Sequence, residues 1–350
     1  MKFHKAIIYY TLSVFAVLSA YFIHGTASSG GFTAITTLRY YLILAGMPLV
    51  DGLAAGFLIY VTLFLVYSLI SVVRRGSQGT EGDETFFLKY LGQRIFRLAR
   101  EFAGVAAICV PVILSSFFLS IVLSYVNHLA RADLKDLWFM KADLTLTGGL
   151  PFVALASFHY PGWFVEVLWA AFLGISFLVI FAAMYIFHIN RKLCVEFAAC
   201  FSLALIIMLA PWRYLPALSP QDRFIDNVYN LPVPSSLALL IDNYHPQAEI
   251  VSFLKEERAM KQPLKDMPTT TMPSAHIAWI TITGYYLYRA RRLAALVGAT
   301  PLALSALGTV FFAQHYFVDI LGGIVAAAIA VAIVRLLDRL GKYHVAQAQA

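Results

Sequence analysis

Long apolar runs are the feature of this sequence that most constrains its fold. Most are about 20 residues long, the length of helix that crosses the hydrocarbon core of a bilayer. Eight such runs cover residues 6–23, 52–73, 103–127, 163–188, 194–211, 275–288, 293–313 and 319–337. The alternating pattern of a transmembrane barrel is absent. The sequence therefore predicts an all-α polytopic membrane protein with about eight transmembrane helices.

Composition agrees with a membrane protein. Of the 350 residues, 60% are hydrophobic and 13% are charged, whereas soluble domains carry about 25% charged residues. The net charge of +7 is therefore interpreted as loop charge, and no nucleic-acid partner is expected. Cys109, Cys194 and Cys200 all lie inside apolar runs, where cysteine acts as a small packing residue, and their spacing matches no metal motif.

The basic residues predict the orientation of the chain. Lys2 and Lys5 precede the first apolar run, which is interpreted as a retained signal-anchor helix. With this end inside, 16 of the 26 basic residues fall on cytoplasmic segments, most of them close to the ends of spans. This bias follows the positive-inside rule. We expect both termini to be cytoplasmic and the loops 128–162 and 212–273 to face the periplasm, the cell exterior or the lumen, in a bacterial inner membrane or a eukaryotic endomembrane.

Four regions follow from these patterns. Residues 1–85 are predicted to form an N-terminal two-helix membrane hairpin, and residues 86–102 a basic amphipathic helix at the membrane surface. Residues 103–340 are predicted to form a six-helix core that includes the extracytoplasmic loop 212–273. Residues 341–350 are predicted to be a cytoplasmic tail.

The first chemical motif is Met272-Pro273-Ser274-Ala275-His276, at the start of a short apolar run. Ser274 is a good N-cap residue, and the first N–H groups of a helix together with its dipole favour bound phosphate. His276 would stand beside that site and could pass a proton to a leaving oxygen. The alternative is a helix cap beside an interfacial histidine with no chemical role.

The second motif is Gln314-His315-Tyr316-Phe317-Val318-Asp319. His315 and Asp319 are four residues apart, so that a helix would place both on one face. A carboxylate that accepts the Nδ1 proton fixes the tautomer and leaves Nε2 as the reactive nitrogen. Ionisable residues at a membrane-helix border favour a functional role; the alternative is a structural hydrogen bond between helices.

Together the two motifs resemble the type-2 phosphatidic acid phosphatase superfamily. The residues of both motifs are most similar to those of its inositol-phosphorylceramide synthase-like branch, in which Pro-Ser-Leu-His and His-His-Tyr-Phe-Val-Asp are typical. That branch also has an Ala-Pro-Pro-Arg-like element, and this chain has Ala210-Pro211-Trp212-Arg213 at the matching place. The resemblance covers roughly residues 103–340.

The resemblance implies roles for individual residues. His315 would attack phosphorus and form a phosphohistidine, Asp319 would orient it, and His276 would protonate the leaving group. Ser274, neighbouring N–H groups and Arg213 would hold the phosphate oxygens. No metal and no cofactor are implied.

The chain departs from the pattern of the superfamily's phosphatases. Gly308-Thr309 stands where they carry Ser-Arg, and their Lys-x6-Arg-Pro element is missing near Arg213. This favours a phosphodiester of lower charge, or compensation by Lys261 or Lys265 from the loop. Against such a role, these lysines alternate with acidic residues beside Lys255 and Arg258, which is typical of a solvated helix face; Arg223 is interpreted in the same way.

The expected function is transfer of a phosphoryl head group from a membrane lipid donor to the hydroxyl of a lipid acceptor, as in sphingolipid or phospholipid metabolism. One alternative is a lipid phosphate or polyprenyl pyrophosphate phosphatase that uses the same residues. A remote alternative is a non-enzymatic transporter or scaffold. The sequence leaves the head group, the acceptor and the oligomeric state open.

Overall fold

The computed structural model describes residues 92–93, 96, 100, 103–104, 134–227, 230–261 and 272–347. Within these residues all regular elements are helical. They are α4 (Asp136–Thr147), α5 (Pro151–Ala156), α6 (Gly162–Leu173), α7 (Ile175–Ile189), α8 (Arg191–Tyr214), the π-helix η2 (Gln221–Ile225), α9 (Ser235–Ile241), α10 (Ala248–Lys261), α11 (Ala275–Ala290), α12 (Arg292–Phe311) and α13 (Phe317–Gln347).

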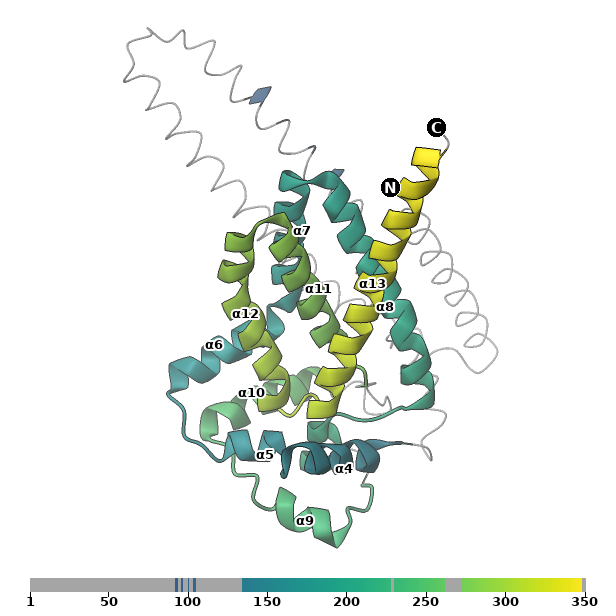
Figure 1. Cartoon of the computed structure of the whole chain (residues 1–350). Helices are drawn as coiled ribbons and strands as arrows, with labels where there is room; N and C mark the ends of the chain where they lie inside the picture. The colour runs from purple at the N-terminus through teal and green to yellow at the C-terminus, as the bar shows by residue number, and fades with distance from the viewer. Residues whose placement is uncertain are drawn as a thin grey trace, which may run out of the picture.

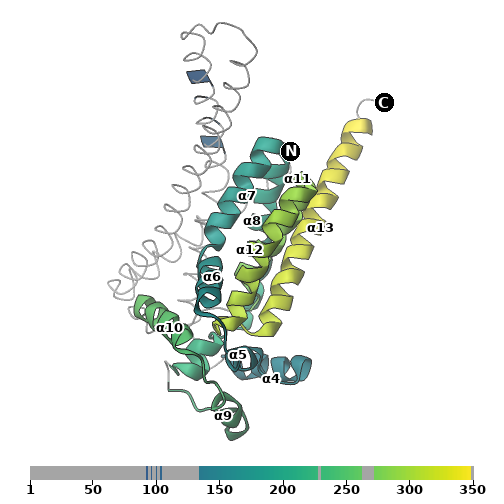
Figure 2. The same cartoon turned by 90° about the vertical axis from the view of Figure 1, so that its left-hand side faces the viewer.

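The long helices form a bundle around α11. This helix packs against α7, α8, α12 and α13; Figure 2 shows these helices side by side, and Figure 1 shows that α8 and α13 cross at an angle. Three helices, α8, α12 and α13, are long and apolar enough to cross a membrane. The large apolar side chains that remain exposed on α12 and α13 include Leu296, Val297, Ile324 and Val325. The chain is therefore an integral membrane protein, as its composition predicts.

The expected span 163–188 is not one straight helix. It divides into α6 and α7, which are bent by 61° at Gly174. A Cβ atom at this position would lie 2.7 Å from the carbonyl oxygen of Ala170, so the local backbone requires glycine. The apolar composition continues through the bend, which is why periodicity alone did not reveal it. With this pair counted as one span, the described residues contain four candidate spans.

Ion pairs tie the helices together at the end of the bundle far from α4 and α5. The Arg289 guanidinium lies 2.6 Å from Glu196 Oε2, which joins α11 to α8. Lys192 Nζ lies 2.8 Å from Asp338 Oδ1, which joins α8 to α13. Glu196 is buried, so these charges are paired within the protein.

Short helices cover the opposite end, which we call the cap end. Figure 1 shows α4, α5, α9 and α10 gathered there, below the bundle. The predicted loop 212–273 contributes η2, α9 and α10 to the cap. Helix α10 packs on α6, where Phe253 stacks on Trp169 at 5.2 Å between ring centroids. Lys255 and Arg258 on α10 are exposed, as expected of a solvated face.

Several predicted regions lie outside the described residues. These are the hairpin 1–85, most of the amphipathic helix 86–102, the span 103–127 apart from its first two residues, and the end of the tail 341–350.

Candidate active site

The turn between α12 and α13 carries His315. Helix α12 ends at Phe311, and the N–H groups of Gln314 and His315 then both donate to Thr309 O, at 2.9 and 3.0 Å. Ala313 adopts φ 53° to make this turn, a left-handed conformation that favours glycine. Since the turn is closed by backbone hydrogen bonds on both sides, the position of His315 is fixed by the ends of two membrane helices.

The cap holds the same turn from below. Gln221 N of η2 donates to Ala313 O at 2.9 Å. The Gln314 side-chain amide donates to Gln221 Oε1, and both glutamine side chains are buried. Gln314 therefore acts as a link between the cap and the turn.

Asp319 lies in the first turn of α13 and contacts His315. Its Oδ2 accepts a hydrogen bond from Tyr316 N at 3.0 Å and lies 3.2 Å from His315 Nδ1. The carboxylate is fully buried, while 15% of the His315 side chain is exposed. With the proton on Nδ1, the imidazole donates to Asp319 and keeps a lone pair on Nε2. The predicted contact between these two residues is thus present, although His315 lies in the turn before α13 and not on a helix.

Ser274 faces the other nitrogen of His315. Its Oγ lies 3.1 Å from His315 Nε2 and accepts from Ile277 N at 3.3 Å, so that Ser274 is the N-cap of α11. One hydroxyl can satisfy both contacts, since it donates to Nε2 and accepts from the backbone. Ser274 N in turn donates to Asp319 O at 3.2 Å. The two motifs predicted from the sequence therefore meet at the first turns of α11 and α13.

His276 lies two residues after Ser274 on α11. Its Nε2 lies 2.8 Å from Ser305 Oγ of α12, and its ring stacks on Phe172 at 5.1 Å with 11° between the planes. Ser305 is fully buried. Ser305 is a site residue that was not predicted, although a serine inside the apolar run 293–313 is the type of signal that marks an intramembrane polar contact.

Asp143 is a second residue of the site that the sequence did not reveal. From α4, its two carboxylate oxygens accept hydrogen bonds from Phe317 N and Val318 N, each at 2.8 Å. It therefore caps α13 next to His315, across 174 residues of sequence. Burial raises the pKa of Asp143 to about 6, an effect that hydrogen bonds from Phe317 and Val318 oppose and the charge of Asp319 reinforces.

Arg223 does not lie on a solvated face, so that interpretation was wrong. Its side chain is buried; Nε lies 3.6 Å from Asp136 Oδ2, and the guanidinium donates to Leu231 O and Pro232 O. Asp136 also accepts from Leu218 N. A guanidinium can be buried when its charge and its N–H donors are all paired. The sequence did not predict this burial of Arg223 because its partner, Asp136, is distant in sequence. This pair lies in the cap and not in the turn that carries His315.

The three predicted phosphate-binding cations are only partly located. Arg213 lies in the last turn of α8, directly after the buried Trp212, whose indole N–H donates to Pro273 O at 2.8 Å. The backbone of Arg213 therefore follows a residue that touches the Ser274 turn, but its side chain lies outside the described part of the structure. Lys261 is the last residue of α10, and its side chain also lies outside the described part of the structure. Lys265 lies wholly outside the described residues.

Among the residues that the structure describes, no cluster of three or more His, Cys, Asp or Glu side chains has the arrangement of a metal site. The groups that could act on a bound molecule are two imidazoles, two hydroxyls and the first N–H groups of α11. Such a set can bind an anion, deliver a nucleophilic nitrogen to it and transfer a proton beside it.

Comparison with known protein families gives a match. The family model described as the PAP2 superfamily matches residues 137–333, more than half of the chain, including both motifs and Asp143. No curated protein and no solved structure matches the chain significantly.

Proposed function

This chain belongs to the PAP2 superfamily, and from that membership, which indicates phosphatase or phosphotransferase activity on lipids, we propose that it is a lipid phosphotransferase. In this proposal it moves a phosphoryl head group from a membrane lipid onto the hydroxyl of a second lipid, at the extracytoplasmic face, as in the inositol-phosphorylceramide synthase-like branch. The observation that carries the proposal is the position of the His315 imidazole between Asp319 and Ser274, 3.2 and 3.1 Å away.

The proposed reaction has two steps. In the first, His315 Nε2 attacks phosphorus, the bond from phosphorus to the leaving oxygen breaks, and His276 gives that oxygen a proton. In the second, His276 takes the proton of the acceptor hydroxyl, whose oxygen attacks phosphorus, and the P–N bond to His315 breaks. Asp319 stabilises the imidazolium in both steps, and atoms and protons balance over the cycle.

The N-terminus of α11 is the proposed cradle for the phosphate oxygens. The N–H groups of Ala275 and His276 lie in the first turn, where no intrahelical partner exists, and the helix dipole favours an anion there. At α13 the corresponding groups already donate to carboxylates, because Asp143 accepts from Phe317 and Val318. Ser274, on displacement from Nε2, adds a hydroxyl donor. Arg213, Lys261 and Lys265 remain proposed additional cations.

Transfer rather than hydrolysis is favoured by the low positive charge of the α12 end of the site. Gly308 and Thr309 replace the Ser-Arg pair of the phosphatases. A Cβ atom at position 308 would lie 2.9 Å from Phe172 Cβ, so this position is closely packed. A phosphodiester, which carries one negative charge, needs fewer cations than a dianionic monoester.

The test uses the purified full-length protein in detergent with a labelled phospholipid donor, with and without ceramide or diacylglycerol as acceptor. The proposal predicts a labelled lipid product that depends on the acceptor and a rate that is unchanged by EDTA. Release of free phosphate from a lipid monophosphate at a rate indifferent to acceptor would favour the phosphatase. Loss of activity in EDTA with recovery in zinc or magnesium would contradict the metal-independent mechanism.

A further inference from the structure

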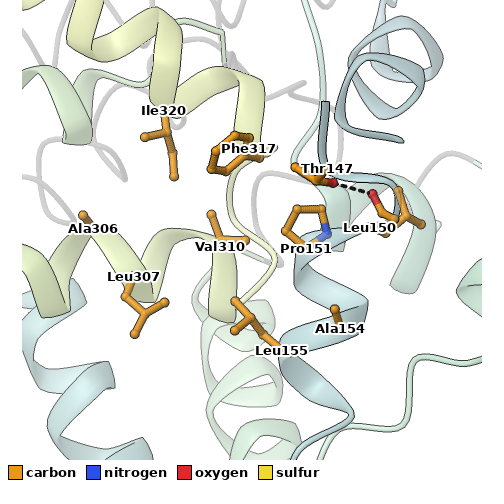
Figure 3. A pocket seen from close by; sticks show the side chains of 11 residues that line it. Thr147, Leu150, Pro151, Ala154, Leu155, Ala306, Leu307, Val310, Phe317 and Ile320 are labelled. Atoms are coloured by element: carbon orange, nitrogen blue, oxygen red, sulfur yellow. Dashed lines mark hydrogen bonds between the residues drawn. The ribbon is translucent and has the colours of Figure 1, made fainter. Parts of the chain in front are cut away.

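A pocket of about 480 Å³ lies at the cap end between α12 and α13. From α12 it is lined by Ala306, Leu307 and Val310, and from α13 by Phe317 and Ile320 (Figure 3). Its volume falls within the range of about 300–1,000 Å³ that is typical of pockets for small ligands. Both helices pack against α11, and α12 also packs on α6 and α13 on α8; the pocket lies between their ends at the cap.

The remaining wall comes from α5 and the turn that joins α4 to α5, including Leu150 and Leu155. Figure 3 shows these side chains on the side facing Val310 and Phe317. Of the lining residues, only Thr147 has a polar side chain, and its Oγ1 lies 2.9 Å from the carbonyl oxygens of both Asp143 and Gly149. The wall therefore offers no uncommitted polar side chain to a head group, and its chemistry fits a hydrocarbon.

The pocket adjoins the candidate active site. Ala306 follows Ser305, which contacts His276, and Ile320 follows Asp319. Successive side chains of a helix point about 100° apart, so the two helices present polar groups toward α11 and apolar groups to the pocket. The turn that carries His315 connects Val310 to Phe317, both of which line the pocket. Only a few residues therefore separate the polar candidate site from the apolar pocket.

The pocket also borders exposed apolar side chains of α12 and α13. Leu307, one of its lining residues, is 38% exposed, and Leu321, beside Ile320, is 40% exposed. Both helices qualify as membrane spans. The exposed edge of the pocket therefore lies on helices that qualify as membrane spans, and its side chains are apolar.

We propose that this pocket holds one hydrocarbon chain, acyl or prenyl, of the lipid whose phosphoryl group reacts at His315. The lipid reaches the site laterally between α12 and α13, with its chain in the pocket and its head group toward the first turn of α11. This inference rests on the proposed function, since it assigns a position to part of that substrate.

The first test fills the pocket. Ala306→Trp places a large ring in it, and Ala154→Trp does the same from α5, where the side chain is exposed. Val297→Trp is the matched control, because Val297 is on α12 and 71% exposed but does not line the pocket. Turnover is compared for a long-chain phospholipid donor and a short-chain donor with the same head group.

Both pocket variants are expected to lose about 10-fold or more in kcat/KM for the long-chain donor, which corresponds to about 1.4 kcal/mol. The short-chain donor should be turned over as by the unmodified protein, and Val297→Trp should match the unmodified protein on both. Wild-type rates on the long-chain donor in both pocket variants would overturn the inference.

A second test does not depend on activity. A phospholipid with a photoreactive group near its chain end is crosslinked to the full-length protein, and the labelled peptides are identified. The inference predicts more label in residues 306–310 and 317–320 than in 293–297, and loss of this excess in Ala306→Trp. Absence of the excess contradicts the pocket assignment even if the enzyme is active. The excess without turnover of either donor contradicts the proposed function alone.

Discussion

Two buried carboxylates, Asp143 and Asp319, divide the backbone donors at the start of α13 between them. Asp319 accepts from Tyr316 N, and Asp143 accepts from Phe317 N and Val318 N. A helix start is normally a place where anions bind, but here these donors are occupied. The consequence is that Asp143 fixes the first residues of α13, while Asp319 contacts both Tyr316 N and His315 Nδ1.

Asp143→Asn tests this arrangement. The amide keeps one acceptor oxygen but turns an NH2 group toward a backbone donor, so the start of α13 and His315 should shift. We expect kcat to fall by roughly 10- to 100-fold, the scale of a small misplacement of a reacting group. Asp242→Asn, at an exposed position in the cap, is the control and should retain full activity. Full activity in Asp143→Asn would show that the cap on α13 does not position His315.

The same variant has a signature in the pH dependence of stability. The pKa of Asp143 is raised to about 6 from 3.8, so between these values the folded protein binds more protons than the unfolded chain. The free energy of unfolding should therefore gain from this group as the pH falls through about 6 and lose that contribution as the pH rises. In thermal unfolding in detergent, Asp143→Asn should show a weaker rise in stability from pH 7 to pH 5 than the unmodified protein. Parallel profiles would contradict the assigned pKa shift.

At the scale of elements, the site depends on a close crossing of α11 and α13. A Cβ atom at Gly323 would lie 2.6 Å from Ser274 O and 3.2 Å from Ala278 N, both of them backbone atoms that cannot move aside. The glycine therefore allows the N-cap of α11 to reach His315. This gives a structural reason for the Gly322-Gly323 pair that follows the second motif.

Gly323→Ala should separate the two helices and pull Ser274 away from His315 Nε2. Overpacking of this kind costs about 1–3 kcal/mol, and we expect a large loss of kcat together with a lower midpoint of thermal unfolding. Gly284→Ala on α11 is the matched control: its Cβ would meet only the Leu302 side chain, at 3.6 Å, so activity should persist. An active Gly323→Ala protein would mean that the crossing tolerates a wider spacing.

The parts of the site that the sequence predicts are the local ones. Ser274 as N-cap and the contact of His315 with Asp319 follow from spacings of a few residues, and both are present. Asp143 and Ser305 were missed because their partners lie 174 and 29 residues away, and no local period encodes such contacts. The bend at Gly174 was missed because both arms of the span are apolar, so hydropathy alone cannot show a change of direction.

At the scale of the whole molecule, the distribution of charge predicts which end of the bundle faces the cytoplasm. Arg289, Arg291 and Arg292 lie at the α11–α12 turn, and Arg191 and Lys192 lie at the α7–α8 turn, all far from the cap. Basic residues beside the ends of spans favour the cytoplasm. The cap and the candidate site should then be extracytoplasmic.

Cysteine labelling in intact cells tests this orientation, in a background without the three native cysteines. An impermeant reagent should label Asn243→Cys, an exposed position in the cap, and should label Arg291→Cys only after the membrane is permeabilised. The reverse pattern would place the site on the cytoplasmic side and remove the extracytoplasmic part of the proposal.

The most direct test of the account is to locate the covalent intermediate. Full-length protein is mixed with a donor lipid radiolabelled at phosphorus, without acceptor, and quenched in alkaline detergent, because phosphohistidine is stable to base. The account predicts label on the peptide that contains His315, loss of that label in His315→Ala, and its retention in the control His245→Ala, an exposed cap residue. Label on another residue, or label that persists in His315→Ala, would contradict His315 as the nucleophile.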